Sequence, residues 1–322
     1  MGEETREKCG VIGVYSSSVE SGDVPYSIYN GLIALQHRGQ ESAGISVLQN
    51  KKIKTKKDMG LVTDIFKTED IDKLASSIGI GHVRYSTTGS STIDNAQPLV
   101  IKEKGLEIAI SFNGNIVNYE ELKSQFENLH QMPFTCSADT ELILKMYSRA
   151  LQAQFLEAKE NTKGNKKNLG IGKDAKEDKP ANPAQNNAKF LPYINAMHNV
   201  MLKLVGAYSI LLLINDGTIV AVRDPKGFKP LSIGRKKTLV NDLTFVASET
   251  AALDALDAQF DRDIKPGEIA IINKNGIYSE QRFNEKHAHC MFEWVYFSRP
   301  DSVIEERPVH DVRVRLGEEL AT

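Results

Sequence analysis

The sequence contains few cysteines and no long apolar run. Its three cysteines, at positions 9, 136 and 290, are widely spaced and form no C-x-x-C pair, which excludes a disulfide framework and a zinc site encoded by cysteine pairs. The strongest apolar run, 210–214, is far shorter than the roughly 18 residues that span a bilayer. Residues 1–8 are polar and lack the apolar stretch of a secretory signal. We therefore expect a cytoplasmic protein with no membrane association.

The chain also lacks an excess of charge of either sign. Its 322 residues include 40 Lys and Arg against 42 Asp and Glu, which gives a formal net charge of −2. This balance excludes binding to a polyanion through bulk positive charge, so we expect no nucleic-acid partner. Apolar residues make up 41% and charged residues 25% of the chain, which is normal for a globular protein with a full core. The length fits one large domain or two small ones.

Short strand-like runs alternate along the chain with amphipathic helical stretches, and no internal repeat is present. Strands are expected at 11–15, 44–49, 78–84, 107–112, 208–214, 218–222, 243–248, 268–273 and 276–282. Helices are expected at 24–36, 119–129, 139–154, 191–205 and 249–256. Turn sequences at 215–217 and 273–276 favour antiparallel pairing. The pattern therefore predicts an α+β fold of packed antiparallel sheets covered by helices.

Residues 158–189 interrupt this pattern. The segment is rich in Lys, Asn, Gly and Ala, contains Pro180 and Pro183, and has almost no large apolar residue. Such a composition contributes nothing to a core, so we expect a mobile, disordered surface insertion. It includes G-I-G-K-D-A at 170–175, which fits a loose dinucleotide-binding pattern. No strand precedes this pattern, so it is a weak indication of a nucleotide site.

Polar residues that suit catalysis occur together with Cys9. Cys9 opens a strand-like segment, and taken alone it is best explained as a small buried residue. Four other segments place polar residues at the end of a strand or in a Gly-rich turn: 36–44, 81–89, 112–115 and 137–141. Side chains in such positions converge on clefts. The combination favours an active site over a set of unrelated structural residues.

These segments resemble the class II glutamine amidotransferases, whose catalytic half is an N-terminal-nucleophile (Ntn) hydrolase domain. Four further segments resemble in particular the branch that transfers ammonia to phosphoribosylpyrophosphate in purine biosynthesis. They are 223–231, 247–250, 265–268 and 296–302. The last of them resembles the junction into a phosphoribosyltransferase domain. The resemblance runs from Cys9 to the C-terminus, without the insertion. It implies a four-layer αββα sandwich of antiparallel sheets.

The resemblance also implies a reaction. Residues 1–8 would be a propeptide whose removal makes Cys9 the N-terminal residue. Its α-amine, with an unperturbed pKa of about 7.7–8.0, can accept the thiol proton near neutral pH. The thiolate then attacks the glutamine side-chain amide, ammonia leaves, and water hydrolyses the thioester to glutamate. Asn113 and the backbone N–H of Gly114 are the implied oxyanion donors, although Asn-Gly is also an ordinary turn sequence.

The substrate-binding residues are likewise implied by the resemblance. Arg84 would bind the α-carboxylate of glutamine through its planar fork, and Asp139 would bind the α-ammonium group. Arg38, Tyr85 and Thr87 would shape the pocket and its closing loop. Two structural alternatives stay open, because Arg84 is also explained as a solvated charge at a strand end and Asp139 as a helix N-cap.

The sequence departs from the family pattern at two positions. Phe112 stands where the family usually has His, and Ala138 replaces a Ser. Neither change removes an oxyanion donor or a substrate ligand, so the glutaminase prediction stands.

Cys290 falls where some members have the first of four cysteine ligands of a [4Fe–4S] cluster, and one Cys cannot hold such a cluster. Cys136 is expected to be a small buried residue near the substrate helix.

The expected domain organisation is a glutaminase domain at 9–285, followed at 286–322 by the junction and the start of a truncated phosphoribosyltransferase domain. We expect no cofactor in this chain. Mg²⁺ and phosphoribosylpyrophosphate would be bound by the missing domain, a [4Fe–4S] cluster would require cysteines from it, and the full-length protein would be a homo-oligomer. Two alternatives to the glutaminase of this branch remain. They are a non-catalytic glutamine-binding regulatory subunit, and another class II amidotransferase such as the glucosamine-phosphate synthase type.

Overall fold

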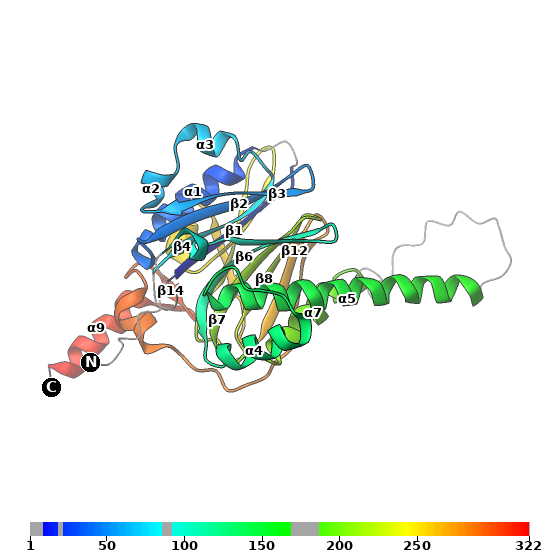
Figure 1. Cartoon of the computed structure of the whole chain (residues 1–322). Coiled ribbons are helices and arrows are strands. Elements are labelled where there is room, and N and C mark those ends of the chain that lie inside the picture. Colours follow the sequence, from blue (N-terminus) through cyan, green and yellow to red (C-terminus); the bar gives the residue numbers. More distant parts are fainter. Residues whose placement is uncertain (1–8, 19–21, 86–91, 169–186, 322) are drawn as a thin grey trace.

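The computed structural model describes residues 9–18, 22–85, 92–168 and 187–321. Two antiparallel sheets packed face to face form its centre (Figure 1). The seven-stranded sheet has the order β11-β9-β10-β1-β4-β2-β3, and the six-stranded sheet has the order β13-β12-β8-β7-β6-β5. The first sheet consists of β1 (Cys9–Ser16), β2 (Ser42–Gln49), β3 (Lys52–Met59), β4 (Ile78–Arg84), β9 (Ser232–Lys237), β10 (Asp242–Ala247) and β11 (Gln259–Asp263). The second consists of β5 (Leu99–Glu103), β6 (Leu106–Ile116), β7 (Gly206–Ile214), β8 (Thr218–Arg223), β12 (Glu268–Asn273) and β13 (Gly276–Gln281).

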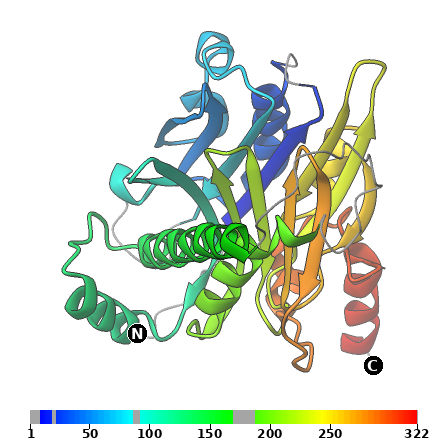
Figure 2. The ribbon, with the colours of Figure 1, turned by 90° about the vertical axis from the view of Figure 1, so that its right-hand side faces the viewer.

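Helices cover the outer face of each sheet (Figures 1 and 2). The seven-stranded sheet is covered by α1 (Val24–Ala34), α2 (Val62–Ile65), α3 (Thr68–Asp72) and α8 (Thr250–Ala255). The six-stranded sheet is covered by α4 (Tyr119–His130), α5 (Asp139–Asn168) and α7 (Leu191–Met201). A one-turn π-helix (Glu293–Phe297), the short β14 (Val303–Ile304) and β15 (Arg307–Pro308), and α9 (Val309–Leu320) follow at the C-terminal end. The arrangement confirms the expected four-layer sandwich.

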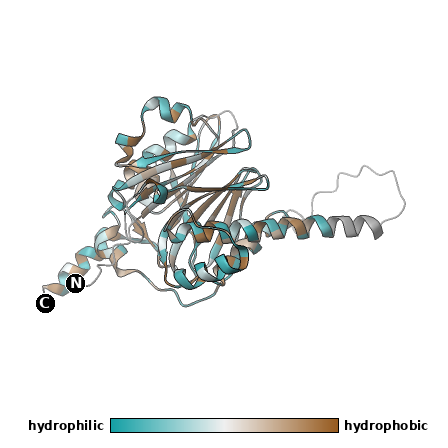
Figure 3. Cartoon of the chain, in the orientation of Figure 1, coloured by the Kyte–Doolittle hydropathy of each residue, from teal (hydrophilic) through white to brown (hydrophobic). Residues whose placement is uncertain are grey.

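The apolar core is divided into three layers by the two sheets. Because successive residues of a strand point to opposite faces, β1 contributes Val11 to the layer between the sheets and Ile12 and Val14 to the layer under α1. The third layer lies between the six-stranded sheet and its helices. Figure 3 shows the strands of both sheets as the mainly hydrophobic part of the ribbon. The central strands of both sheets therefore have one face in the central layer.

The helix α5 is longer than the sequence predicted. It was expected to end at Gln154, but it continues to Asn168 and extends away from the body of the molecule (Figure 1). Residues 158–168, which were expected to be disordered, are therefore helical. Ala, Lys and Glu are good helix formers and make up six of the eleven residues at 158–168, which explains the difference. The rest of the proposed insertion up to residue 186, with the pattern at 170–175, lies outside the described residues.

Several elements have no clear periodicity in the sequence. The strand β3 is an edge strand with the sequence KIKTKKDM, and charged edge strands are a common protection against aggregation. The strands β5, β9 and β11 were also not expected. In the described part of the chain, no helix has both the length and the apolar character needed to cross a membrane.

Candidate active site

The pleat of two neighbouring strands directs Cys9 and Arg84 to the same side. Cys9 of β1 lies opposite Arg84 of β4 in the antiparallel pairing. Cys9 shares its face of β1 with Val11, and Arg84 shares its face of β4 with Ile80; both apolar residues belong to the layer between the sheets. Because alternate residues of a strand share a face, the thiol and the guanidinium face the six-stranded sheet.

Asn113 approaches the same space from the opposite sheet. It lies in β6 and shares a face with Ala109, which also belongs to the layer between the sheets. The side chain is fully buried, and neither Nδ2 nor Oδ1 has a hydrogen-bond partner in the described structure. A buried amide without a partner costs about 1–3 kcal/mol. An amide kept in this state is available for a ligand, which fits the predicted oxyanion donor.

The environment of the Cys9 thiol has opposing effects on its acidity. Burial raises the pKa of the thiol above its usual value, while a hydrogen bond from the backbone N–H of Tyr85 and the positive charges of Arg84, Lys229 and Arg38 lower it in part. The net effect is a raised pKa, so the thiol is mainly protonated at neutral pH. The geometry therefore requires a base, and it supplies surroundings that stabilise the thiolate once it has formed.

The backbone around the oxyanion residues is fixed by two buried side chains. Gln97 Oε1 accepts a hydrogen bond from Phe112 N–H at 2.7 Å, and His82 Nε2 donates to the Phe112 carbonyl at 3.0 Å. Burial lowers the pKa of His82 to about 3, so its ring is neutral. A Cβ on Gly114 would lie 2.2 Å from the carbonyl oxygen of Ala207, so only glycine fits there.

This support explains the departure from the family pattern at Phe112. Its side chain points into the outer core, between the six-stranded sheet and its helices, and only its backbone is in contact with His82 and Gln97. A His at this position is therefore replaced without loss of the backbone geometry at Asn113. Sequence reasoning did not single out His82 or Gln97 for this role.

Arg84 has a carboxylate partner. Its Nη1 lies 2.7 Å from Glu41 Oε1, and Arg84 itself is 4% exposed, so it is a buried residue and not a solvated strand-end charge. The loop before Glu41 packs tightly on β4, because a Cβ on Gly39 would lie 2.6 Å from the Arg84 carbonyl carbon. These contacts orient the guanidinium. Glu41, within the segment 36–44, was not singled out from the sequence.

Asp139 is the first residue of α5. Its Oδ2 accepts a hydrogen bond from Ile116 N–H at 3.1 Å, which connects the start of the helix to the end of β6, two residues after Gly114. The carboxylate is buried. Asp139 is therefore held near the oxyanion candidates, and its binding of the α-ammonium group stays a prediction. Tyr85 directly follows β4, and Thr87 lies outside the described residues.

Arg38 contacts the nucleophile residue directly. It ends the short 3₁₀ helix Gln36–Arg38 and is fully buried, and its Nε donates to the Cys9 carbonyl at 2.9 Å. Its terminal nitrogens bind Glu249 and both carboxylate oxygens of Glu293. Burial opposes the charge, but Glu293 and Glu249 hold the pKa of Arg38 above its usual value. The expected supporting residue thus belongs to a buried ionic cluster that the sequence did not reveal.

The described residues contain no group of three or more His, Cys, Asp or Glu side chains arranged to hold a metal ion. Cys290 is half-buried, just before the π-helix Glu293–Phe297. Its role as an iron–sulfur ligand stays a prediction that requires further cysteines. Cys136 is half-buried, packs against the outer core, and has its pKa raised to about 11, chiefly by burial.

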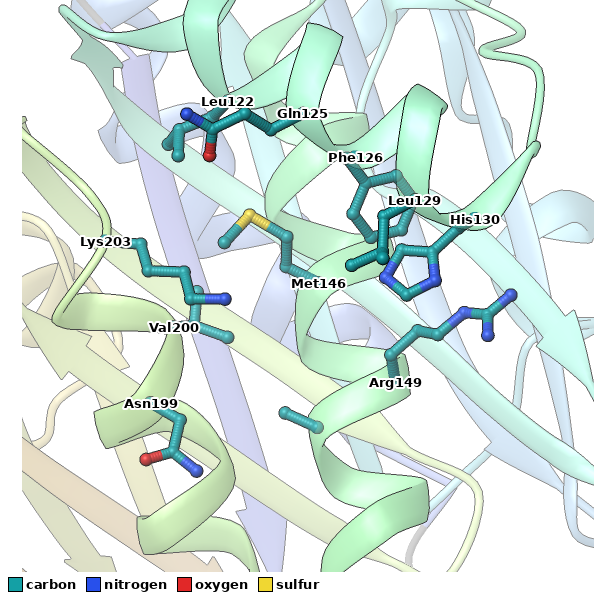
Figure 4. Close-up of a pocket in the computed structure, with 11 residues that line it drawn as sticks. Leu122, Gln125, Phe126, Leu129, His130, Met146, Arg149, Asn199, Val200 and Lys203 are labelled. Atoms are coloured by element: carbon teal, nitrogen blue, oxygen red, sulfur yellow. The ribbon is translucent and has the colours of Figure 1, made fainter.

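A separate hollow of about 360 Å³ lies in the outer helical layer. Figure 4 shows that its walls come from α4, α5 and α7. The side chains around it include Leu122, Phe126, Met146, Arg149, Val200 and Lys203. None of the candidate catalytic or substrate-binding residues in the described part of the chain lines it. This hollow is therefore distinct from the site between the sheets.

Comparisons with known proteins agree with this geometry. The family model of the glutamine amidotransferase domain matches residues 70–159. An amidophosphoribosyltransferase of Methanothermobacter thermautotrophicus is 41% identical over 98% of this chain and 58% of its own length. The chloroplastic amidophosphoribosyltransferase 2 of Arabidopsis thaliana is 36% identical, over 99% of this chain and 49% of its own length. The chain thus spans about half to three fifths of these relatives.

Solved structures give the same result. The structure of the allosteric regulatory enzyme of purine biosynthesis superposes with a TM-score of 0.78 at 33% identity, covering 97% of this chain and 57% of that one. The glutamine phosphoribosylpyrophosphate amidotransferase from B. subtilis gives a TM-score of 0.76 at 33% identity, with 97% and 58% covered. The chain therefore matches a glutamine amidotransferase domain and is similar, over nearly all of its own length, to part of the amidophosphoribosyltransferases.

Proposed function

We propose that this domain hydrolyses glutamine to glutamate and ammonia with Cys9 as the nucleophile. The observation that carries the proposal is the buried amide of Asn113, which has no hydrogen-bond partner among the described residues and faces the same space between the sheets as Cys9. A thiol and an oxyanion donor that approach one space from opposite sheets are the two groups that amide hydrolysis through a thioester needs.

The reaction begins with removal of residues 1–8, which frees the α-amine of Cys9. Because the thiol has a raised pKa, the amine accepts its proton directly or through a water molecule. The thiolate attacks the side-chain carbonyl carbon of glutamine, and Asn113 Nδ2 and Gly114 N–H bind the oxyanion. The ammonium form of the amine returns the proton to the leaving nitrogen, and ammonia departs. Water then hydrolyses the thioester, which releases glutamate and restores the thiol.

Glutamine is held by charges at its α-carbon end. Arg84, oriented by Glu41, binds the α-carboxylate through its planar fork. Asp139, held at the end of β6, binds the α-ammonium group. Tyr85 and Thr87 complete the pocket and its closing loop. Both charged residues are buried, and a bound amino acid would place an opposite charge beside each of them.

Together with a phosphoribosyltransferase domain, ammonia would pass to phosphoribosylpyrophosphate to give 5-phosphoribosylamine and pyrophosphate. The support comes from the relatives, which are amidophosphoribosyltransferases and of which the chain spans about half to three fifths. The phosphoribosylpyrophosphate site, with its Mg²⁺, would lie in a phosphoribosyltransferase domain beyond the segment 9–302. Cys290 would contribute to a [4Fe–4S] cluster only with three cysteines from that domain.

The test is glutamate and ammonia release by the chain whose N-terminus has been shown to be Cys9, compared with Cys9→Ala. We expect hydrolysis by the first and none by the second. A chain with a free Cys9 that binds glutamine without hydrolysing it would favour the regulatory subunit. Formation of an amino sugar, with no product from phosphoribosylpyrophosphate in the complete protein, would favour another class II amidotransferase.

A further inference from the structure

The charged cluster around Arg38 is buried to a degree that is unusual for ionised side chains. Arg38 is 0%, Glu249 1% and Glu293 2% exposed. Glu293 binds the guanidinium through both oxygens, at 3.0 Å from Nη1 and 2.8 Å from Nη2, and Glu249 binds it through Oε1. The remaining nitrogen, Nε, donates to the Cys9 carbonyl. All three nitrogens of the guanidinium are therefore occupied, and one of them holds the nucleophile residue.

The second oxygens of the two carboxylates bind the segment 293–302. Glu249 Oε2 accepts from Arg299 N–H at 2.9 Å and from the Ser302 hydroxyl at 2.7 Å. Glu293 Oε2 accepts from the Ser298 hydroxyl at 3.0 Å. Glu249 is also bound by His37 Nε2 at 2.8 Å. The segment 293–302 is thus connected to Cys9 through one continuous set of hydrogen bonds.

The attachment of Cys9 explains why such a cluster matters. When residues 1–8 are removed, Cys9 is joined to the chain only through its carbonyl carbon. The thiol and the amine both belong to this residue, so rotation about its Cα–C bond moves both of them relative to the substrate. The Arg38 hydrogen bond to the Cys9 carbonyl holds the peptide plane that carries Cα, and so fixes the position of Cα and the axis of this rotation. Arg38 can do so only while its own position is fixed, which is the effect of its two carboxylate partners.

We propose that Glu249 and Glu293 are positioning residues for the nucleophile, acting through Arg38. Glu293 lies beyond residue 285, which was the expected end of the glutaminase domain. The segment 293–302 therefore contributes to the glutaminase site and is not only a junction to a following domain. Movement of this segment would change the orientation of Cys9. This inference rests on the proposed glutaminase function.

The test compares Glu293→Gln and Glu293→Ala with Asp301→Asn in the full chain. Asp301 lies in the same segment but pairs with Arg299 at the surface, at 54% and 44% side-chain exposure, so its variant is the matched control. We measure kcat and KM for glutamine, the rate of Cys9 labelling by diazo-oxo-norleucine, and the melting temperature.

We expect kcat and the labelling rate to fall about 10- to 100-fold in Glu293→Ala, as for other misplaced reacting groups. Glu293→Gln, whose amide oxygen still accepts a hydrogen bond from Arg38, should lose less. KM should stay within about twofold, because Arg84 and Asp139 are not touched. Asp301→Asn should behave as the wild type. A purely structural role would instead lower the melting temperature and leave the kcat of the folded fraction unchanged.

Ser302→Ala provides a second variant if Glu293→Ala does not fold. It removes one hydrogen bond to Glu249 without changing any charge, and we expect the labelling rate to fall about threefold, the effect of about 0.7 kcal/mol. If the unmutated chain is active and both Ser302→Ala and Glu293→Gln react at its rates, this inference is overturned but the proposed function is not. A wild-type chain that begins with Cys9 and does not hydrolyse glutamine would overturn the proposed function itself.

Discussion

Replacing Asn113 by alanine removes a buried amide whose Nδ2 and Oδ1 have no hydrogen-bond partner in the described structure. If Nδ2 binds the oxyanion, its loss should raise the barrier by about 2.7–4 kcal/mol and lower kcat about 10²- to 10³-fold. The free energy of unfolding should change little. Removing an unpartnered buried amide recovers about 1–3 kcal/mol of desolvation penalty, which offsets the small cavity that alanine leaves.

Ser111→Ala is the matched control for this change. Ser111 precedes Asn113 by two positions on the same face of β6, and its buried hydroxyl also has no hydrogen-bond partner within the ranges that the structure describes. Glutamine hydrolysis and thermal unfolding are measured for both variants. We expect both melting temperatures to stay within about 2–4 °C of the wild type, the shift that 1 kcal/mol produces in a domain of about 150–250 residues, and only Asn113→Ala to lose activity. Retention of a third or more of the rate in Asn113→Ala would refute the oxyanion assignment.

Three further changes test other parts of the site. Arg84→Lys should raise KM for glutamine about tenfold with a smaller effect on kcat, because Lys lacks the planar fork; steady-state kinetics checks this. Gly114→Ala should abolish activity, since its Cβ would lie 2.2 Å from the Ala207 oxygen, whereas Gly105→Ala on an open turn should not. His82, whose folded pKa is about 3 against 6.5 when unfolded, binds its proton only in the unfolded state between these values. Stability should therefore fall as pH drops below 6.5, by about 1.4 kcal/mol per unit from this group, and denaturant unfolding at pH 6.5 and 5 should show a smaller loss in His82→Asn.

The sequence predicted the strands whose one face is strongly apolar. Six of the predicted strands contribute to the core between the sheets: β1, β4, β6, β7, β8 and β12. Their alternating or continuous apolar residues identified them as strands in the sequence. The edge strand β3, with its run of lysines, was missed because its identity depends on pairing with β2 and not on its own composition. The extension of α5 to Asn168 was missed for a related reason, since a run of helix formers with few apolar residues shows no hydrophobic periodicity.

The site was predictable where a residue type carries its own chemistry. Cys9 opens an apolar strand, while Arg84, Asn113 and Asp139 lie in polar segments that carry the family resemblance. The structure brings all four to neighbouring positions on β1, β4, β6 and the start of α5. Their roles in catalysis and binding stay proposals.

The supporting contacts were not predictable, because they join positions far apart in the sequence. Arg38 and Glu293 are separated by 255 residues, and Glu249 lies 211 residues from Arg38. A buried Glu and a surface Glu look alike in a sequence, and only the tertiary fold shows which one meets an arginine. His82 was inconspicuous for the same reason, because its partner Phe112 offers only a backbone carbonyl.

The central claim is that Cys9 acts as an N-terminal nucleophile. Its most direct test is the intact mass and N-terminal sequence of the protein before and after incubation with diazo-oxo-norleucine, with the labelled residue located by peptide mapping. The account predicts a chain that begins with Cys9 and gains a single adduct on its thiol. A chain that begins with Cys9 and gains no adduct, or gains it on Cys136 or Cys290, would contradict the account.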